Sequence, residues 1–177
     1  TVALATCLGD GLIGLVPLVL AWGWLRGRPD LRAATVRAGL AAVMALAVSA
    51  LIGTFWPHPR PFMAGLAPDL LGHVPDASFP SDHLTLMWSV AISLMLARCS
   101  RRVGLVLALL GLPMAWARIW LGVHFPLDMA GALAVGGSAA WLLQAVFGSP
   151  VSWLVGYLQT MRNRILSPLI ARGWASR

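Results

Sequence analysis

Five apolar runs, each close to the length of a membrane-crossing helix, limit this chain to one class of fold. A spanning helix needs about 20 mostly apolar residues. The runs cover residues 6–25, 36–56, 82–97, 103–121 and 126–147. Only 11% of the residues are charged and 59% are hydrophobic, whereas a soluble domain has about 25% charged residues. The sequence therefore predicts an all-α, polytopic membrane helix bundle with five transmembrane helices.

The last part of the chain differs from these runs. Residues 151–177 contain Trp153 and Tyr157 together with four arginines. The arginines are Arg162, Arg164, Arg172 and Arg177. This pattern is typical of an amphipathic helix that lies on the membrane surface; a sixth, short span is the alternative. We expect a membrane-embedded domain over 1–150 and a basic segment over 151–177 on the cytoplasmic side.

Arginine clusters indicate the orientation of the helices. All thirteen basic residues are Arg, and eleven fall in three groups on the same side of the predicted bundle, within residues 26–37, 98–102 and 162–177. Such clusters mark the cytoplasmic side. The net charge of +7 does not indicate nucleic-acid binding, because the arginines form no single patch with interleaved aromatics. Arg60 and Arg118 fall at the opposite face, so topology does not explain them.

The non-cytoplasmic face receives a long loop over about 57–81, a short one over about 122–125, all four histidines and four of the six aspartates. The histidines are His58, His73, His83 and His124, and the aspartates are Asp69, Asp76, Asp82 and Asp128. His58 and His73 are interpreted as loop residues that could form a pocket rim. Asp10 is interpreted as part of a helix-entry turn.

The cysteines and the start of the chain carry less information. Cys7 and Cys99 are expected near opposite membrane faces, so we predict no disulfide between them, and no Cys/His cluster has metal-ligand spacing. The chain begins at Thr1 without Met, so an N-terminal segment is expected to be missing. No basic region precedes the first apolar run, and a cleavable signal peptide is not expected.

The stretch Phe79-Pro80-Ser81-Asp82-His83 has the chemistry of an anion site. Ser81 is suited to the N-cap of a helix, and Pro80 disfavours helix before it. The first N–H groups of a helix have no intrahelical partner and bind phosphate readily. We expect Ser81 and these N–H groups to hold an anion, with His83 in the first turn within reach of it.

A second stretch runs from Arg118 through His124 to Asp128. Pro126 is suited to the first turn of a helix, and a carboxylate four residues after His124 can accept one ring N–H and leave the other nitrogen free. Such a histidine can be a nucleophile or a general base. The guanidinium of Arg118 can bind two phosphate oxygens.

Together these residues predict attack on phosphorus without a metal. His83 would protonate the leaving oxygen, and Arg60 would be a second clamp on the phosphate. The alternatives are structural: Arg60 could snorkel to the interface, and His124 with Asp128 could be a helix-capping pair. A small transporter is the rival from another class, but the ionisable groups gather at one face and do not thread the bilayer.

The motifs Arg60-Pro61, Pro80-Ser81-Asp82-His83 and Arg118-x5-His124-x3-Asp128 resemble those of the type 2 phosphatidic acid phosphatase (PAP2) superfamily in order and spacing. Three positions depart from the pattern: the lysine of the first motif falls at Gly53, the glycine of the second is Asp82, and the serine of the third is Ala117. Asp82 favours the bacitracin-resistance type of undecaprenyl pyrophosphate phosphatase.

The resemblance implies roles and an activity. His124 would form a phosphohistidine, oriented by Asp128, and His83 would be the acid. Arg60, Arg118, Ser81 and the amide of Asp82 would bind phosphate, with no cofactor or metal. The substrate would be undecaprenyl pyrophosphate, hydrolysed at the outer face of a bacterial plasma membrane. The alternatives are another lipid phosphate (phosphatidylglycerophosphate, phosphatidic acid or lipid A) and transfer to an acceptor other than water.

Overall fold

The structure, a computed structural model, describes residues 1–172, apart from the side chains of Gly148, Ser149 and Leu169. Arg177, which we assigned to the basic C-terminal segment, lies outside the described residues. Residues 1–172 are all helix and loop, without a strand. The elements in chain order are α1 (Val2–Thr6), the π-helical turn η1 (Cys7–Gly11), the 3-10 turn η2 (Leu12–Gly14), α2 (Leu15–Arg26), α3 (Pro29–Phe55), α4 (Asp82–Leu96), the 3-10 turn η3 (Arg98–Ser100), α5 (Arg101–Trp120), α6 (Pro126–Ala145), α7 (Gly148–Ile165) and α8 (Ser167–Ala171).

Each of the five predicted runs corresponds to a helix, so the all-α membrane class is confirmed. Within residues 1–172, four helical segments are long and apolar enough to cross a membrane. They are Val2–Arg26, Pro29–Phe55, Arg98–Trp120 and Pro126–Ala145. Helix α4 has 15 residues and is about 22 Å long at 1.5 Å per residue. Because a hydrocarbon core is about 30 Å thick, a total of five spans stays a prediction.

Helix α3 begins at Pro29, seven residues before the predicted start at 36. The prediction placed Arg32 before the helix, in the stretch through which the chain enters it. Arg32 is nevertheless almost fully buried, and its Nε donates to the carbonyl oxygen of Gly27 at 2.8 Å. An arginine near a helix end can therefore be helical when it binds a backbone carbonyl in the preceding turn.

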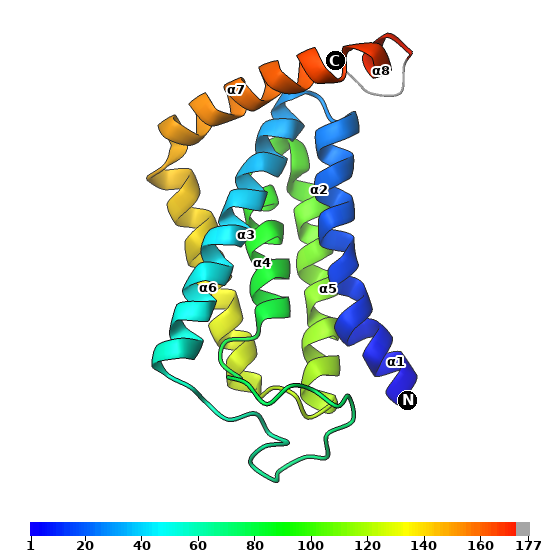
Figure 1. Ribbon diagram of the computed structural model, residues 1–177, viewed down its shortest axis with the longest axis vertical. Coiled ribbons are helices and arrows are strands. Elements are labelled where there is room, and N and C mark those ends of the chain that lie inside the picture. The colour runs from blue at the N-terminus through cyan, green and yellow to red at the C-terminus, as the bar shows by residue number, and fades with distance from the viewer. Residues whose placement is uncertain (173–177) are drawn as a thin grey trace.

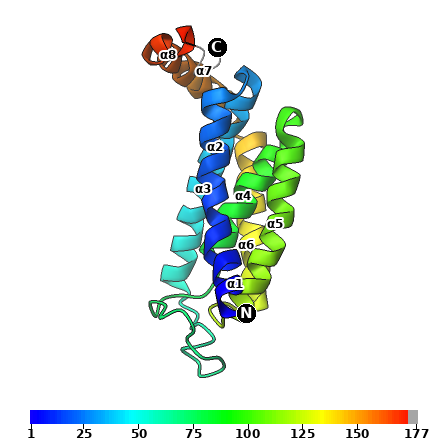
Figure 2. The same ribbon diagram turned by 90° about the vertical axis from the view of Figure 1, so that its right-hand side faces the viewer.

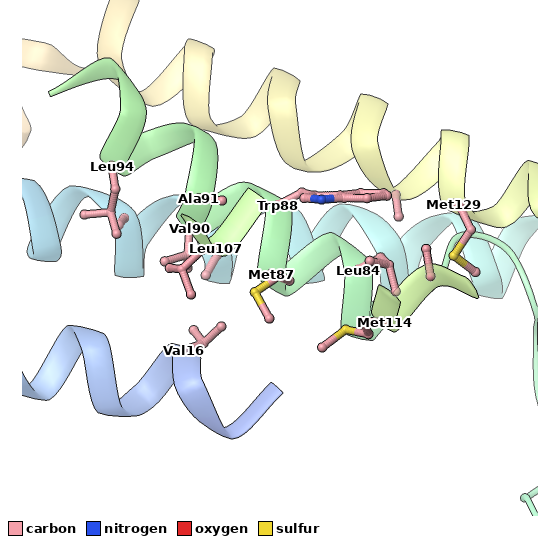
Figure 3. Close-up of a cluster of buried hydrophobic side chains, with 14 of the residues drawn as sticks. Val16, Leu84, Met87, Trp88, Val90, Ala91, Leu94, Leu107, Met114 and Met129 are labelled. Atoms are coloured by element: carbon pink, nitrogen blue, oxygen red, sulfur yellow. The ribbon is translucent and has the colours of Figure 1, made fainter. Parts of the chain in front are cut away.

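Helix α4 lies at the centre of the bundle, surrounded by α2, α3, α5 and α6 (Figures 1 and 2). Figure 3 shows side chains of α4 directed toward Val16 of α2, and Met114 of α5 and Met129 of α6 beside them. The fully buried side chains of α4 include Leu84, Met87, Val90 and Leu94. Because these apolar residues fill the interior, the position of α4 is determined by contacts on all sides.

Two glycines bring the backbones of neighbouring helices against α4. A Cβ added at Gly136 of α6 would lie 2.9 Å from the amide nitrogen of Ser89, and one added at Gly104 of α5 would lie 2.5 Å from the carbonyl oxygen of Ala91. Small residues at helix contacts allow such close approach within membranes. The middle of α6 and the start of α5 thereby lie directly against the backbone of α4.

We expect Gly136→Ala to destabilise the protein by about 1–3 kcal/mol, the cost of overpacking a tight contact. The added methyl group would meet the α4 backbone at Ser89 and Thr85, which cannot move as a flexible side chain would. The measurement is the midpoint of thermal unfolding in detergent. Gly39→Ala is the matched control, because Gly39 of α3 has no atom within 4 Å of an added Cβ. An equal midpoint for both variants would contradict the prediction.

The bundle has two different ends (Figure 1). The α2–α3 and α4–α5 junctions lie at one end, where α7 crosses the bundle, and the long loop between α3 and α4 lies at the other. Arg162 of α7 is 3% exposed and donates to the carbonyl oxygens of Trp24 and Leu25, at 3.2 and 2.8 Å. It therefore binds carbonyls at the end of α2. The boundary at residue 150 between two parts stays a prediction.

Candidate active site

The candidate site lies at the loop end of the bundle, where α3 and α5 end and α4 and α6 begin (Figure 1). The start of α4 is bound to the start of α6, because the amide of Ser81 donates to the carbonyl oxygen of Asp128 at 3.4 Å. Gly122, with φ of 73°, turns the chain between α5 and α6, a conformation that favours glycine. That turn places His124 beside the end of α5.

His124 and Asp128 form the buried centre of the site, as their spacing predicted. They are 2% and 1% exposed, and Nδ1 of the ring lies 3.2 Å from Oδ2 of Asp128. The same oxygen accepts from the Phe125 amide at 2.8 Å and from the Ser78 hydroxyl at 2.5 Å. Two further donors therefore hold the carboxylate in place, which fixes the face that it presents to the ring.

The contacts of His124 determine its tautomer. Its Nε2 lies 3.1 Å from a terminal nitrogen of Arg60, and a guanidinium can only donate. Nε2 must therefore be the accepting nitrogen, which leaves the proton on Nδ1, facing the carboxylate of Asp128. Arg60 is itself positioned by the Val123 carbonyl at 2.9 Å and by Asp76 at 2.6 Å. The unprotonated nitrogen of the ring is thus the one that faces the cationic side of the site.

Burial lowers the pKa of His124 below its ordinary value of 6.5, and the charge of Arg60 acts in the same direction, against the hydrogen bond to Asp128. A lowered pKa means that the neutral ring persists to a more acidic pH. We expect nitrogen-15 NMR of labelled histidine, assigned with His124→Gln, to show Nδ1–H in the neutral ring and a titration midpoint below about 6.5. A midpoint at or above that value, or an Nε2–H tautomer, would contradict the geometry.

Arg118 and His83 share a carboxylate that the sequence did not lead us to expect. Asp10 lies 2.5 Å from a terminal nitrogen of Arg118 and 3.6 Å from Nε2 of His83. The interpretation of Asp10 as a helix-entry turn is therefore wrong: it lies in the π-helical turn η1, inside a continuous helical segment. The signal was present, because an ionisable residue within an apolar run is costly and is commonly functional.

Some polar atoms at this end are buried without a partner in the described part of the chain, and two of them lie at the start of α4 and the end of α5. They are the hydroxyl of Ser81 and Nε of Arg118, and both side chains are at most 1% exposed. Ser81 is the N-cap of α4, as predicted, but its hydroxyl makes no bond to the helix. A buried donor without a partner carries a desolvation cost, which a bound anion would remove.

The side chain of Asp82, the aspartate of the second motif, is hydrogen-bonded within the protein, whereas its backbone amide lies at the start of α4. The carboxylate of Asp82 accepts from the Ser49 hydroxyl of α3 at 2.6 Å. Its backbone amide is the first of α4, and the four first N–H groups of a helix lack intrahelical acceptors. The amide of Asp82 is thus available to a ligand, while its side chain ties α4 to α3.

Other residues near the site were not assigned roles from the sequence. Ser78 bonds Asp128, and Asp76 bonds Arg60. The pKa of the loop histidine His73 is lowered, mainly by burial and then by the charges of Arg60 and Arg118. The path of the long loop brings these residues to the site, and their spacing in the sequence does not reveal these contacts.

Two apolar cavities adjoin the polar residues. One, of about 400 Å³, is lined by residues of η2, α3 and α4, namely Ile13, Leu46, Ala50, Asp82, His83 and Leu86. The other, of about 430 Å³, is lined by Trp56, His58, Phe79, Phe125, Pro126, Leu127 and Asp128. A site with an anion-binding centre and apolar walls fits an amphipathic ligand.

Comparison with known proteins identifies the family. The sequence profile of the PAP2 superfamily matches residues 34–150, which contain all three motifs. This chain belongs to the PAP2 superfamily. The resemblance seen in the sequence is therefore confirmed, and with it the class of membrane phosphatase.

The curated relatives of this PAP2 protein include two that are named for one activity. It is 33% identical to YbjG of Escherichia coli K12 over 175 residues, 98% of this chain and 87% of the relative. It is 38% identical to the undecaprenyl-diphosphatase BcrC of Bacillus subtilis 168 over 118 residues, 67% of this chain and 60% of the relative. The name of YbjG carries the same activity.

A solved structure supports the PAP2 fold independently of these names. The crystal structure of LpxE from Aquifex aeolicus superposes with a TM-score of 0.63 and 25% sequence identity, over 80% of this chain and 81% of that one. The agreement extends across most of the helical bundle.

The structure shows the surroundings of two positions at which this PAP2 protein departs from the usual motifs. Gly53, where the first-motif lysine would fall, lies in the last turn of α3, and an added Cβ would meet Ala77 of the long loop at 3.3 Å. Ala117 is fully buried in a small cluster with Ala5, Leu121 and Val123. A serine hydroxyl at that position would enter apolar surroundings.

Proposed function

We propose that this PAP2 protein hydrolyses undecaprenyl pyrophosphate to undecaprenyl phosphate and inorganic phosphate. The observation that carries the proposal is the pair of buried, partnerless polar atoms on Ser81 and Arg118, at the same end as the oriented ring of His124. Phosphate oxygens would accept from both atoms. The activity named for BcrC, together with the apolar cavity beside His83, supports a pyrophosphate joined to a long lipid.

In the first step, Nε2 of His124 attacks the terminal phosphorus. A nitrogen–phosphorus bond forms as the bond between phosphorus and the bridging oxygen breaks, and His83 gives its proton to that oxygen. Asp128 stabilises the positive charge that develops on the attacking ring. Arg60, Arg118, Ser81 and the amide of Asp82 hold the phosphoryl oxygens as their charge increases. Undecaprenyl phosphate leaves.

In the second step, water attacks the phosphohistidine. Neutral His83 accepts a proton from that water as the new oxygen–phosphorus bond forms and the nitrogen–phosphorus bond breaks. Inorganic phosphate leaves, and both histidines return to their starting states. The protein groups alone supply nucleophile, acid, base and charge stabilisation.

The site is proposed to lie on the periplasmic or outer face of a bacterial plasma membrane. The arginine clusters of the interhelical junctions and α7 lie at the opposite end of the bundle, and such clusters favour the cytoplasmic side. A substrate with its pyrophosphate at the outer surface would reach the site without crossing the bundle.

The test is phosphate release by the purified full chain in detergent with EDTA present. The panel contains undecaprenyl pyrophosphate, phosphatidylglycerophosphate, phosphatidic acid and lipid A. We expect undecaprenyl pyrophosphate to give the highest kcat/KM. Inactivity on the whole panel would refute a lipid phosphatase, and a higher kcat/KM for another lipid would refute the proposed substrate. A second lipid phosphate formed when an alcohol acceptor is added would reveal phosphotransfer.

A further inference from the structure

The N-terminal helical segment contributes a carboxylate to the phosphate-binding end of the site. Asp10 contacts Arg118 at 2.5 Å and His83 at 3.6 Å, although 108 and 73 positions separate it from them in the chain. Its side chain is 42% exposed, whereas that of Arg118 is 1% exposed. Arg118 thus meets a half-exposed anion on one nitrogen while its Nε stays buried without a partner.

The segment that carries Asp10 is fixed against the end of α5. Ala5 packs with Ala117, Leu121 and Val123 in a fully buried cluster. Gly9 is buried. A Cβ added at Gly9 would lie 3.4 Å from the side chain of Leu121 and 3.6 Å from that of Arg118, so the backbone of this segment packs against both. The π-helical turn Cys7–Gly11 carries Asp10 at this point, and such turns often occur at functional sites.

We propose that Asp10 is a positioning residue that holds Arg118 and His83 for the phosphate and limits how tightly the phosphate product is retained. The inference rests on the function proposed above. Asp10 binds one terminal nitrogen of Arg118, which orients the guanidinium and leaves Nε for the ligand. Asp10 also lies 3.6 Å from Nε2 of His83, so one carboxylate positions both side chains.

The second part of the role is electrostatic. Arg60 and Arg118 attract inorganic phosphate as strongly as the phosphoryl group of the substrate, so an unopposed cationic site would release its product slowly. Asp10 places a negative charge against one of these arginines, and like charges in a shared site repel. Its charge therefore weakens the binding of the free phosphate that leaves last.

The decisive variant is Asp10→Asn, which keeps the shape of the side chain and removes its charge. We expect kcat to fall about tenfold and inorganic phosphate to bind about tenfold more tightly. Loss of the Asp10 charge explains both changes, because Arg118 and His83 lose their positioning carboxylate and the phosphate is no longer repelled. Asp10→Glu, which keeps the charge, is expected to stay within about threefold of wild type in both quantities. Asp30→Asn is the matched control, because Asp30 is an exposed aspartate in the first turn of α3.

Two measurements separate this inference from the proposed function. Inorganic phosphate is titrated against the thermal unfolding midpoint of each full-length protein, which needs no turnover, and kcat is measured with the lipid substrate. If no lipid is hydrolysed, the proposed function fails while the phosphate titration still tests Asp10. Unchanged or weaker phosphate binding in Asp10→Asn would overturn the inference. Failure of both Asp10→Asn and Asp10→Ser to fold, with Asp10→Glu folded, would show a purely structural role and also overturn it.

Discussion

His124→Ala is expected to reduce the rate of phosphate release by about 10⁴-fold or more, the scale of loss when a nucleophile is removed. The expectation follows from the unprotonated Nε2, which the contact with Arg60 assigns, and from the buried carboxylate behind Nδ1. No other histidine of the described chain has this pair of contacts. Release is measured as inorganic phosphate from undecaprenyl pyrophosphate, under conditions saturating for wild type.

A trapping experiment tests the same residue by a different observable. Each protein is quenched with acid-free denaturant during turnover of substrate that is labelled at the terminal phosphate. The wild-type protein should then carry the label, and His124→Gln should carry none. Asp128→Asn should retain label but at a rate lower by about 10²–10⁴-fold, because it removes the group that fixes the tautomer. All variants must unfold near the wild-type midpoint. More than a tenth of the wild-type rate in His124→Ala would reject the role of nucleophile.

Arg118→Lys is expected to lower kcat/KM by about 10²–10³-fold, although it keeps the positive charge. An ammonium cannot present two parallel N–H groups to phosphate, and it cannot supply the Nε donor that is buried here without a partner. It also cannot contact Asp10 and a phosphate in one fixed plane. The measurement is the kinetics of phosphate release together with the inhibition constant of inorganic phosphate.

The control for this substitution lies on the same helix. Arg102 is an exposed residue at the opposite end of α5, and Arg102→Lys should leave kcat/KM within about twofold of wild type, as expected for a surface change. If Arg118→Lys behaved like Arg102→Lys, a general positive charge would be sufficient at the site, and the argument from guanidinium geometry would fail.

The parts of the site that were predictable from the sequence are those set by local geometry. His124 and Asp128 are four residues apart around a proline that begins a helix, so their contact follows from the backbone alone. The N-cap position of Ser81 follows from the proline before it. Arg118 and Arg60 stood out because the topology of the arginine clusters did not require them at that face.

The parts that were not predictable depend on packing between distant segments. Asp10 meets Arg118 because Ala5 packs against the end of α5, and nothing in its own neighbourhood specifies that contact. Ser78 and Asp76 reach the site through the path of the long loop. In the fold, the predicted run began at 36 and left out the first turns of α3, where Arg32 is buried and binds the Gly27 carbonyl.

The packed interior between the two ends of the bundle has a consequence for how the carrier lipid is reused. Leu84, Met87, Val90 and Leu94 fill much of the interior between the site and α7, and moving an ionised group through apolar surroundings is prohibitively unfavourable. With the proposed activity, undecaprenyl phosphate stays in the leaflet where the bond was cut, and inorganic phosphate enters the water on that side. Undecaprenyl phosphate must then be returned across the bilayer by a separate flippase. The rate of that return, rather than the rate of hydrolysis alone, would set how quickly the carrier lipid is reused.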